Sequence, residues 1–306
     1  MIPSFLLQIL ADPISKEQLR FDAEKGLLTD EATNQQYSIK KNVPVLIAAT
    51  TESEKETTAL HKQYNSSFSY IEHYNKDAEF FNYFDKEPKV VAEERKRNRT
   101  FIRSKIPKDA NLILDIGCGS SWVAGAFTAE KKYVVSLDVS ETNPIKAYET
   151  YSNAYHAAVV ADAKHLPFKN DSFDAIIAAE IIEHLAVPKT FIAEWLRVLK
   201  PGGTLIIETP FDEQIVYHLC VHCDCPTPAN AHLHSFNEKN IQSHLPDADY
   251  TTSTFVFNNK WMNKLRLNFL LHWLPLSIWS KLDTVANNLT GNAESFIIKI
   301  VKGKSS

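Results

Sequence analysis

The stretch Leu112-Ile-Leu-Asp-Ile-Gly-Cys-Gly-Ser-Ser121 decides the fold that we expect for this chain. An apolar run ends at an acidic residue and then turns through two glycines, which predicts a buried strand and a tight loop that holds a ligand. Glycine permits positive φ and lets the backbone approach a ligand closely, and a helix beginning at about Ser121 would direct free N–H groups at that ligand. The stretch therefore predicts a site for a nucleotide-like cofactor.

The spacing of the glycines narrows the class of cofactor. A doubly wound sheet can bind NAD, FAD or S-adenosylmethionine (SAM) at this place. The dinucleotide fingerprint Gly-x-Gly-x-x-Gly has a third glycine where this chain has Trp122. Because an indole leaves little room for a pyrophosphate, we do not expect a dinucleotide.

The composition is that of an ordinary globular protein. With 306 residues and 44% hydrophobic content, the chain can hold one large domain and a small one. A formal net charge of −4 gives no general attraction to nucleic acid, so we expect no nucleic-acid partner. The basic residues between Lys96 and Lys108 favour a solvated helix face over a binding site.

Targeting signals are weak at both apolar segments. The N-terminus has no basic start, and Gln8 interrupts its apolar run, so it is a poor secretory signal and we expect a cytoplasmic protein. The segment 269–279 is too short to span a bilayer and contains Pro275, so we expect no transmembrane segment. An internal helix is favoured there over docking on a membrane surface.

The order of the predicted elements indicates an α/β fold. From residue 110 the pattern alternates between strand and helix, as in a parallel sheet with right-handed crossovers. Two later apolar runs would complete a seven-stranded sheet. The seven predicted strands are 112–116, 133–137, 157–160, 173–179, 204–209, 252–257 and 295–301.

We divide the chain into two domains. Residues 1–49 are predicted to form a small, ribbon-like, β-rich domain. Residues 50–306 are predicted to form the main domain, with a core at 108–210, an insert at 211–236 and a helical addition at 260–290. The aromatic residues of the helical segment 55–106 would either line an entrance to the site or pack in a core, and packing is favoured.

Polar residues follow three further predicted strands. Asp138 ends the second strand and can accept hydrogen bonds from both hydroxyls of a ribose, although a helix cap is the alternative. Val139 can lie against an adenine, and Asp162 with the backbone of Ala163 can bond to its edge. Glu180 ends the fourth strand, where ligands bind in open α/β sheets.

The set of motifs resembles a class I SAM-dependent methyltransferase of the type 11 kind, over about residues 60–210. The motifs, in order, are Asp115-Ile-Gly-Cys-Gly, Asp138, Asp162-Ala-Lys-His-Leu-Pro-Phe, Phe173-Asp, Glu183-His-Leu and Leu199-Lys-Pro-Gly-Gly-Thr-Leu. The resemblance implies a Rossmann-like seven-stranded methyltransferase sheet with SAM as its cofactor. Ser121 departs from the family, which often has a third glycine there, but a small residue should still fit.

The resemblance also assigns roles to the cofactor residues. It implies that Asp115, Gly117 and Gly119 hold the methionine part of SAM and that Asp138 binds the ribose. Val139, Asp162 and Ala163 would bind the adenine, and Glu180 would lie near the methionine amine.

Two residues are candidates for a catalytic base. An O–H or C–H acceptor needs a base, whereas an already nucleophilic atom needs mainly alignment. Glu180 and His184 are placed to supply one, although a structural hydrogen bond is favoured for His184. Neither residue identifies the acceptor.

The insert after the fifth strand carries a possible metal site. Cys220 and Cys223 have the spacing of a zinc knuckle, and Cys225 and His232 complete the predicted ligands for zinc. Some bacterial methyltransferases carry a similar insert. Reduced thiols and histidines around a substrate pocket are the alternative, and four cysteines of this kind do not form a disulfide framework.

The N-terminal unit resembles the small zinc-ribbon family whose members activate methyltransferases. Leu6 to Pro13 and Val43 to Leu46 match the start and the end of that family. Where its zinc-binding members carry two Cys-x-x-Cys pairs, this chain has Asp12, Ser15, Glu31 and Asn34, which are not structural zinc ligands. We predict a metal-free module that supports the fold or binds a protein partner, and zinc bound by residues 12–34 would refute this.

These observations favour an enzyme that moves the methyl group of SAM to a small or carrier-linked metabolite. RNA or protein methylation is the main alternative, because activators of the N-terminal type serve such enzymes, but the acidic balance opposes RNA. A non-catalytic partner protein that binds SAM or no ligand is the third possibility.

Overall fold

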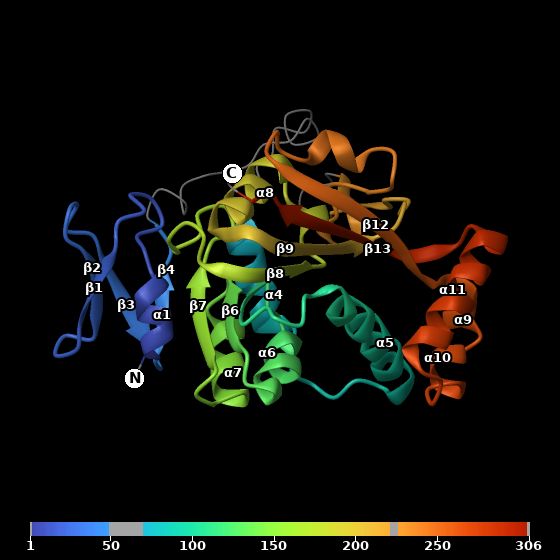
Figure 1. Ribbon diagram of the computed structural model, residues 1–306, viewed down its shortest axis with the longest axis horizontal. Coiled ribbons are helices and arrows are strands. Elements are labelled where there is room, and N and C mark those ends of the chain that lie inside the picture. The colour runs from blue at the N-terminus through green and yellow to red at the C-terminus, as the bar shows by residue number, and fades with distance from the viewer. Residues whose placement is uncertain (1, 49–69, 221–225, 305–306) are drawn as a thin grey trace.

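A computed structural model describes residues 2–48, 70–220 and 226–304 of the chain (Figure 1). Most of its strands belong to one large sheet. They are β1 (Leu19–Asp22), β2 (Leu27–Asp30), β3 (Gln36–Lys40), β4 (Val43–Leu46), β5 (Leu112–Ile116), β6 (Tyr133–Asp138), β7 (His156–Ala161), β8 (Phe173–Ala179), β9 (Leu199–Pro210), β12 (Tyr250–Asn259) and β13 (Ala293–Lys302). The strands β10 (Tyr217–Leu219) and β11 (Pro226–Pro228) form a separate pair.

The helices connect these strands. The α-helices are α1 (Ser4–Ile9), α4 (Tyr70–Phe80), α5 (Lys89–Lys105), α6 (Trp122–Phe127), α7 (Thr142–Thr150), α8 (Pro188–Val198), α9 (Lys260–Lys264), α10 (Leu267–Leu270) and α11 (Leu276–Thr290). Short 3-10 helices are η1 (Thr128–Glu130), η2 (Ile182–His184), η3 (Ala229–Ala231) and η4 (Ile241–His244). Within the described ranges, none of the helices combines the length and the apolar character that crossing a bilayer requires.

The sheet is mixed, with a parallel centre and antiparallel strands at both ends. Its strand order is β1-β2-β3-β4-β7-β6-β5-β8-β9-β13-β12. The six strands β4, β7, β6, β5, β8 and β9 run parallel to one another. The strand β13 runs antiparallel to both β9 and β12. The β5 strand lies in the middle, with the reversal of strand order that creates a ligand crevice in open α/β sheets.

Both faces of the sheet are buried. Along β5, Leu114 belongs to a cluster that includes Trp195 of α8, whereas Ile113 belongs to a second cluster that includes Phe101 of α5 and Trp279 of α11. Successive side chains of a strand point to opposite faces, so this division places helices on the two sides of the sheet. The near-continuous apolar runs of the predicted strands have this physical cause.

The prediction of seven strands is wrong, because the sheet contains eleven. All seven predicted segments are strands, and the other four come from the N-terminus. Val45 and Leu46 of β4 pair in parallel with Val160 and Ala161 of β7, and β1 to β3 continue outward from there (Figure 1). An unpaired β7 edge would expose backbone N–H and C=O groups, and β4 satisfies them.

A polar network lies within the N-terminal unit. Asp12 accepts hydrogen bonds from the backbone N–H groups of Ile14 and Ser15 and from the hydroxyl of Tyr37, at 2.7, 2.8 and 2.7 Å. The hydroxyl of Ser15 donates to the fully buried Asp30 at 2.8 Å. The residue facing Ser15 is thus Asp30, whereas the sequence comparison pointed to Glu31 and Asn34. The metal-free module stays a prediction.

The helices of the C-terminal addition lie between the last two strands in sequence order. The helices α9, α10 and α11 follow β12 and precede β13, and α10 and α11 pack against α5. They lie at the end of the molecule opposite to β1 and β2 (Figure 1).

Candidate active site

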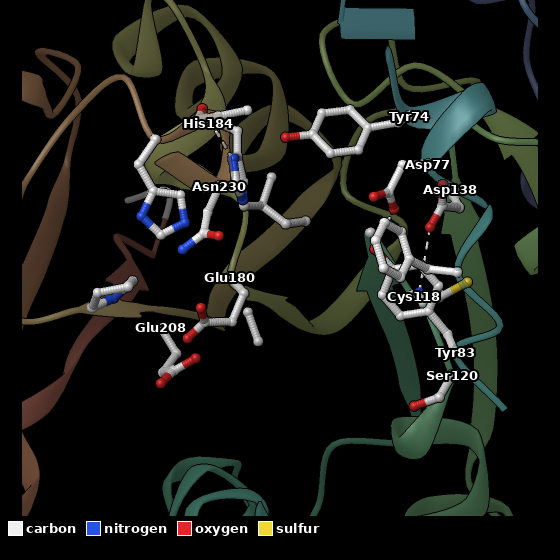
Figure 2. Close-up of a pocket in the computed structure, with 18 of the residues that line it drawn as sticks. Tyr74, Asp77, Tyr83, Cys118, Ser120, Asp138, Glu180, His184, Glu208 and Asn230 are labelled. Carbon is white, nitrogen blue, oxygen red and sulfur yellow. Dashed lines mark hydrogen bonds between the residues drawn. The ribbon is translucent and has the colours of Figure 1, made fainter. Parts of the chain in front are cut away.

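A cavity of about 1670 Å³ lies at the carboxyl ends of the central parallel strands. Its walls include the residues that follow β5, the end of β6, the end of β7, the end of β8 and the end of β9. Typical ligand pockets have about 300–1,000 Å³, so this cavity has space for a nucleoside and a second molecule. Figure 2 shows several of its lining residues.

The glycine loop forms one wall. Gly117 and Gly119 have φ of 64° and 46°, the left-handed region that favours glycine. A Cβ on Gly117 would lie 2.2 Å from the end of the Ile181 side chain, so another residue would require Ile181 to move as well as a strained positive φ. The backbone N–H of Cys118 donates to the carbonyl oxygen of Leu137 at 2.9 Å, and this bond folds the loop back toward β6.

Asp138 is fixed on the other side of this loop. One carboxylate oxygen accepts the N–H and the hydroxyl of Ser140, each at 2.9 Å. The other accepts the amide of Asn143 at 3.2 Å and the N–H of Gly119 at 3.3 Å. Burial raises the pKa of Asp138, and these donors counteract the rise. The carboxylate is therefore held in one orientation at the cavity wall (Figure 2).

Asp115 is buried at the end of β5 beside the same loop. Within the described residues, its Oδ2 accepts no hydrogen bond. Burial first, and then the charge of Asp138, raise the pKa of Asp115 well above its usual range, while Arg99 acts in the opposite direction. A buried carboxyl oxygen without a donor is costly, so the site favours a ligand that brings a donor or a positive charge.

Of the other predicted cofactor residues, two line the cavity and one is buried behind its wall. Val139 and Ala163 line the cavity. Asp162 is 1% exposed and is not among the lining residues, and its carboxylate accepts the N–H of Lys164 at 2.9 Å. Burial raises the pKa of Asp162. The structure therefore gathers the predicted cofactor residues, with Asp162 behind the wall.

The helix α4 and the loop after it cover the glycine loop. Tyr70, Tyr74, Phe80 and Phe81 line the cavity. Tyr70 also belongs to the main apolar cluster and Tyr74 packs against it, so both alternatives, an entrance and core packing, apply to these aromatics. The ring of Tyr83 lies 3.5 Å from the position that a Cβ on Gly119 would occupy. Its hydroxyl donates to Asp77 at 2.5 Å (Figure 2).

Three carboxyl groups gather at the ends of β8 and β9. The N–H of Glu180 donates to the carbonyl oxygen of Glu208 at 2.9 Å, and the two side chains point toward each other (Figure 2). Glu180 is exposed to the cavity, but the surrounding protein walls desolvate its carboxyl, and this desolvation, followed by Glu208 and Glu183, raises the pKa of Glu180 well above its usual range. Burial raises the pKa of Glu183 to about 8. This end of the cavity favours a cation or a proton.

His184 and His232 lie beside these carboxyls. Their ring centroids are 4.8 Å apart, and His184 Nδ1 bonds to the carbonyl oxygen of Ala231 at 3.3 Å. Burial first, and then His232, lower the pKa of His184 to about 4, so its ring is neutral at pH 7. His184 thus makes a hydrogen bond of the structural kind that we expected. It lies in the short 3-10 helix η2.

The predicted zinc ligands of the insert are only partly described. Cys223 and Cys225 lie outside the described residues. Cys220 is half-buried, and His232 is 7% exposed beside His184. Among the described residues, the group whose geometry suits a metal consists of Glu183, His184 and His232.

Sequence reasoning missed several lining residues, among them Glu208, Tyr83 and Glu213. Glu208 ends a predicted strand, so the rule that placed Glu180 at the site could have found it. Tyr83 and Glu213 carried no signal, because loops of variable path bring them to the cavity.

Comparisons with known proteins agree with this geometry. Residues 114–207 match the family described as "Methyltransferase domain". A demethylmenaquinone methyltransferase of Clavibacter sepedonicus is 34% identical over 106 residues, which are 34% of this chain and 43% of that protein. A probable tRNA methyltransferase 9B of Homo sapiens is 34% identical over 114 residues, 36% of this chain and 23% of that protein. The chain thus matches less than half the length of either relative.

A solved structure also matches. It is phosphoethanolamine N-methyltransferase 2 of Haemonchus contortus, in complex with phosphomonomethylethanolamine and S-adenosylhomocysteine, at 16% identity and a TM-score of 0.47. The match covers 69% of this chain and 53% of that one. The family match and the two relatives support a SAM-dependent methyltransferase domain around residues 114–207, and the substrates named for the relatives differ in class.

Proposed function

We propose that this protein transfers the methyl group of SAM to a small or carrier-linked metabolite. The observation that carries the proposal is the pair of buried carboxyls at the ends of adjacent parallel strands, Asp115 and Asp138, on either side of the Gly117 and Gly119 loop. When bound, SAM supplies a methyl group on a positively charged sulfur. A site with an unpaired buried carboxyl suits such a cation.

The residues present fit the cofactor. Asp115 has a carboxyl oxygen to accept the methionine amine, and the glycine loop leaves backbone groups accessible where a Cβ would block them. Asp138 would accept the ribose hydroxyls, and Val139 and Ala163 would border the adenine. Tyr83 covers the loop and would exclude water from it.

Glu180 is the better candidate for a base. Its carboxyl lines the cavity, and the raised pKa means that it holds a proton more tightly than an ordinary glutamate. His184 also lines the cavity, but burial lowers its pKa to about 4, which makes it a weak proton acceptor. In its ionised form, Glu180 would therefore accept the proton of an O–H acceptor.

The charge of the cavity argues for an acceptor without phosphates at its reacting end. The lining contains more carboxyl groups than cations. The acids are Asp77, Asp85, Glu87, Glu94, Asp115, Asp138, Glu180, Glu208, Glu213 and Glu294, and the cations are Lys86, Arg95, Arg99 and Lys260. Nucleic-acid sites neutralise phosphates with Lys and Arg, so this lining favours a neutral or cationic metabolite over RNA.

Calorimetry with S-adenosylhomocysteine tests the cofactor site. We expect wild type to bind, and Asp138→Ala to bind at least about a hundredfold more weakly, because two charge-assisted hydrogen bonds of about 1.5–3 kcal/mol each are lost. Asp138→Asn keeps the size of the side chain and should also bind at least tenfold more weakly. Thermal melting of each variant confirms folding.

The matched control is Asp171→Ala, which removes an exposed carboxylate paired with Lys302 at 2.7 Å. It should leave the affinity unchanged. Absence of binding in wild type would leave the non-catalytic alternative. Labelled methyl transfer from SAM to small metabolites, RNA and protein then identifies the acceptor, and labelled RNA or protein alone would overturn the metabolite proposal.

A further inference from the structure

We infer that Glu183, His184 and His232 form a site for a divalent first-row transition metal ion at the edge of the cavity. Each of the three residues offers one ligand atom, and these atoms all lie within 4.8 Å of one another. His184 Nε2 lies 3.9 Å from Glu183 Oε1. The three residues come from η2 and from the segment after η3, which the fold brings together from distant parts of the sequence.

The two imidazoles are oriented as metal ligands. His232 Nδ1 donates to the carboxylate of Glu213 at 2.5 Å, and His184 Nδ1 donates to the carbonyl of Ala231 at 3.3 Å. Each bond leaves Nε2 as the nitrogen with a free electron pair. Metal-ligating histidines usually donate their other N–H to a carboxylate or a backbone carbonyl in this way.

The carboxylate supplies an independent observation. Glu183 is completely buried, and its Oε2 accepts the hydroxyl of Thr209 at 3.0 Å. Its Oε1 accepts no hydrogen bond from the described residues. An unsatisfied buried oxygen is costly, and a cation between Oε1 and the two imidazoles would satisfy it.

The ligand types indicate the class of metal. Two imidazoles and one carboxylate are the donors found in non-haem iron sites and in catalytic zinc sites, where further positions stay open. Mg²⁺ and Ca²⁺ prefer oxygen ligands, so we expect them to bind much more weakly. His184 and His232 also line the cavity, so an ion held here would stabilise negative charge on an oxygen acceptor. Only that last role rests on the proposed function.

This site differs from the one that the sequence suggested. Its ligands share only His232 with the predicted set of Cys220, Cys223, Cys225 and His232. It also makes His184 a ligand rather than a catalytic base.

The test is calorimetry of the chelator-treated full chain with Zn²⁺, Mn²⁺ and Mg²⁺ separately. We expect stoichiometric binding of Zn²⁺ or Mn²⁺ and at least tenfold weaker binding of Mg²⁺. Glu183→Gln and His232→Gln should each weaken the affinity at least a hundredfold. Glu213→Gln, which removes only the partner of His232, should weaken it about 10–100-fold.

The control separates the two possible sites. The double variant Cys220→Ser with Cys223→Ser should keep wild-type affinity, and the Co²⁺-loaded protein should lack the intense absorption of a thiolate ligand. Absence of binding in wild type, or loss of binding in the cysteine variant with retention in Glu183→Gln, would overturn the inference.

Binding of S-adenosylhomocysteine to the same variants is a separate readout. Its retention shows that a variant with lost metal affinity is still folded. If wild type binds metal but not S-adenosylhomocysteine, the proposed function fails and the metal site stands.

Discussion

Ser121 occupies a position where the family loop often has a third glycine, and its surroundings explain why serine fits. It is completely buried with φ of 52°, and its hydroxyl contacts that of Ser136 in β6. Ser136 bonds in turn to His156 Nε2 at 2.9 Å, and His156 Nδ1 donates to the carbonyl of Tyr151 at 3.1 Å. This chain of polar groups ties the loop to β6 and β7, which glycine could not do.

His156 should make the folding stability depend on pH. Burial lowers the pKa of His156 from 6.5 to about 4 in the folded protein. As the pH falls, His156 therefore takes up a proton in the unfolded chain before it does so in the folded protein. This group therefore contributes stability that is fully present above about pH 6.5 and is lost as the pH falls through about 4. The difference corresponds to about 3 kcal/mol.

The variant His156→Gln does not titrate and should lose this part of the acid sensitivity. Urea unfolding at several pH values measures the free energy of unfolding of both proteins. We expect wild type to lose about 3 kcal/mol more than the variant between about pH 7 and pH 4. Parallel curves for the two proteins would contradict the assignment.

The helical addition formed by α9, α10 and α11 has one side packed against the protein and one side exposed to solvent. Trp279 of α11 is completely buried, with the guanidinium of Arg97 4.1 Å from its ring centre. Trp261 and Trp273 are 48% and 68% exposed, so packing explains only one of the three tryptophans. The exposed apolar residues of α11 recur at helical spacing, at Ile278, Leu282, Val285 and Leu289.

Replacement of tryptophans should separate the two sides. Trp279→Ala should lower the free energy of unfolding by about 3–5 kcal/mol, because it leaves a cavity between α11 and α5. Trp273→Ala, the matched surface variant, should change it by less than about 0.5 kcal/mol. Denaturant titration measures both. Equal losses would show that this side of the addition is not exposed in solution.

The whole molecule is organised by one sheet that both domains share. Where the N-terminal unit meets the main domain, the backbone N–H of Lys169 donates to the carbonyl oxygen of Ile9 at 2.9 Å. The backbone N–H of Ala11 donates to the carbonyl oxygen of Pro167 at 3.0 Å. Leu10 is completely buried in the same apolar cluster as Phe168 of the main domain. The N-terminal unit thus covers the β7 edge and one end of the core.

We therefore expect the chain to unfold as one unit around this junction. Leu10→Ala should lower the free energy of unfolding by about 2–5 kcal/mol and shift a single calorimetric transition to lower temperature. The exposed variant Ile14→Ala is the control, since Ile14 is 50% exposed. Two transitions, of which only the lower responds to Leu10→Ala, would instead support independent domains.

The cofactor end of the site was predictable because its signals are local. The strand and loop at 112–121, and the acids that end the next strands, follow one another in the sequence, and the carboxyl ends of parallel strands meet at one edge of a sheet. Their roles in binding remain predictions. Glu208 was accessible to the same rule, whereas Tyr83 and Glu213 reach the cavity through loops whose path no local pattern specifies.

The sequence by itself determined the α/β class, the seven segments that become its strands, and the glycine loop with Asp115 and Asp138. The reason is that hydrophobic periodicity and glycine spacing record local backbone geometry. Only the tertiary structure decided that the N-terminal strands extend the sheet, because pairing with an open edge depends on position in space. Only the tertiary structure brought Glu183, His184 and His232 together, because a contact between distant segments produces no regular spacing in the sequence.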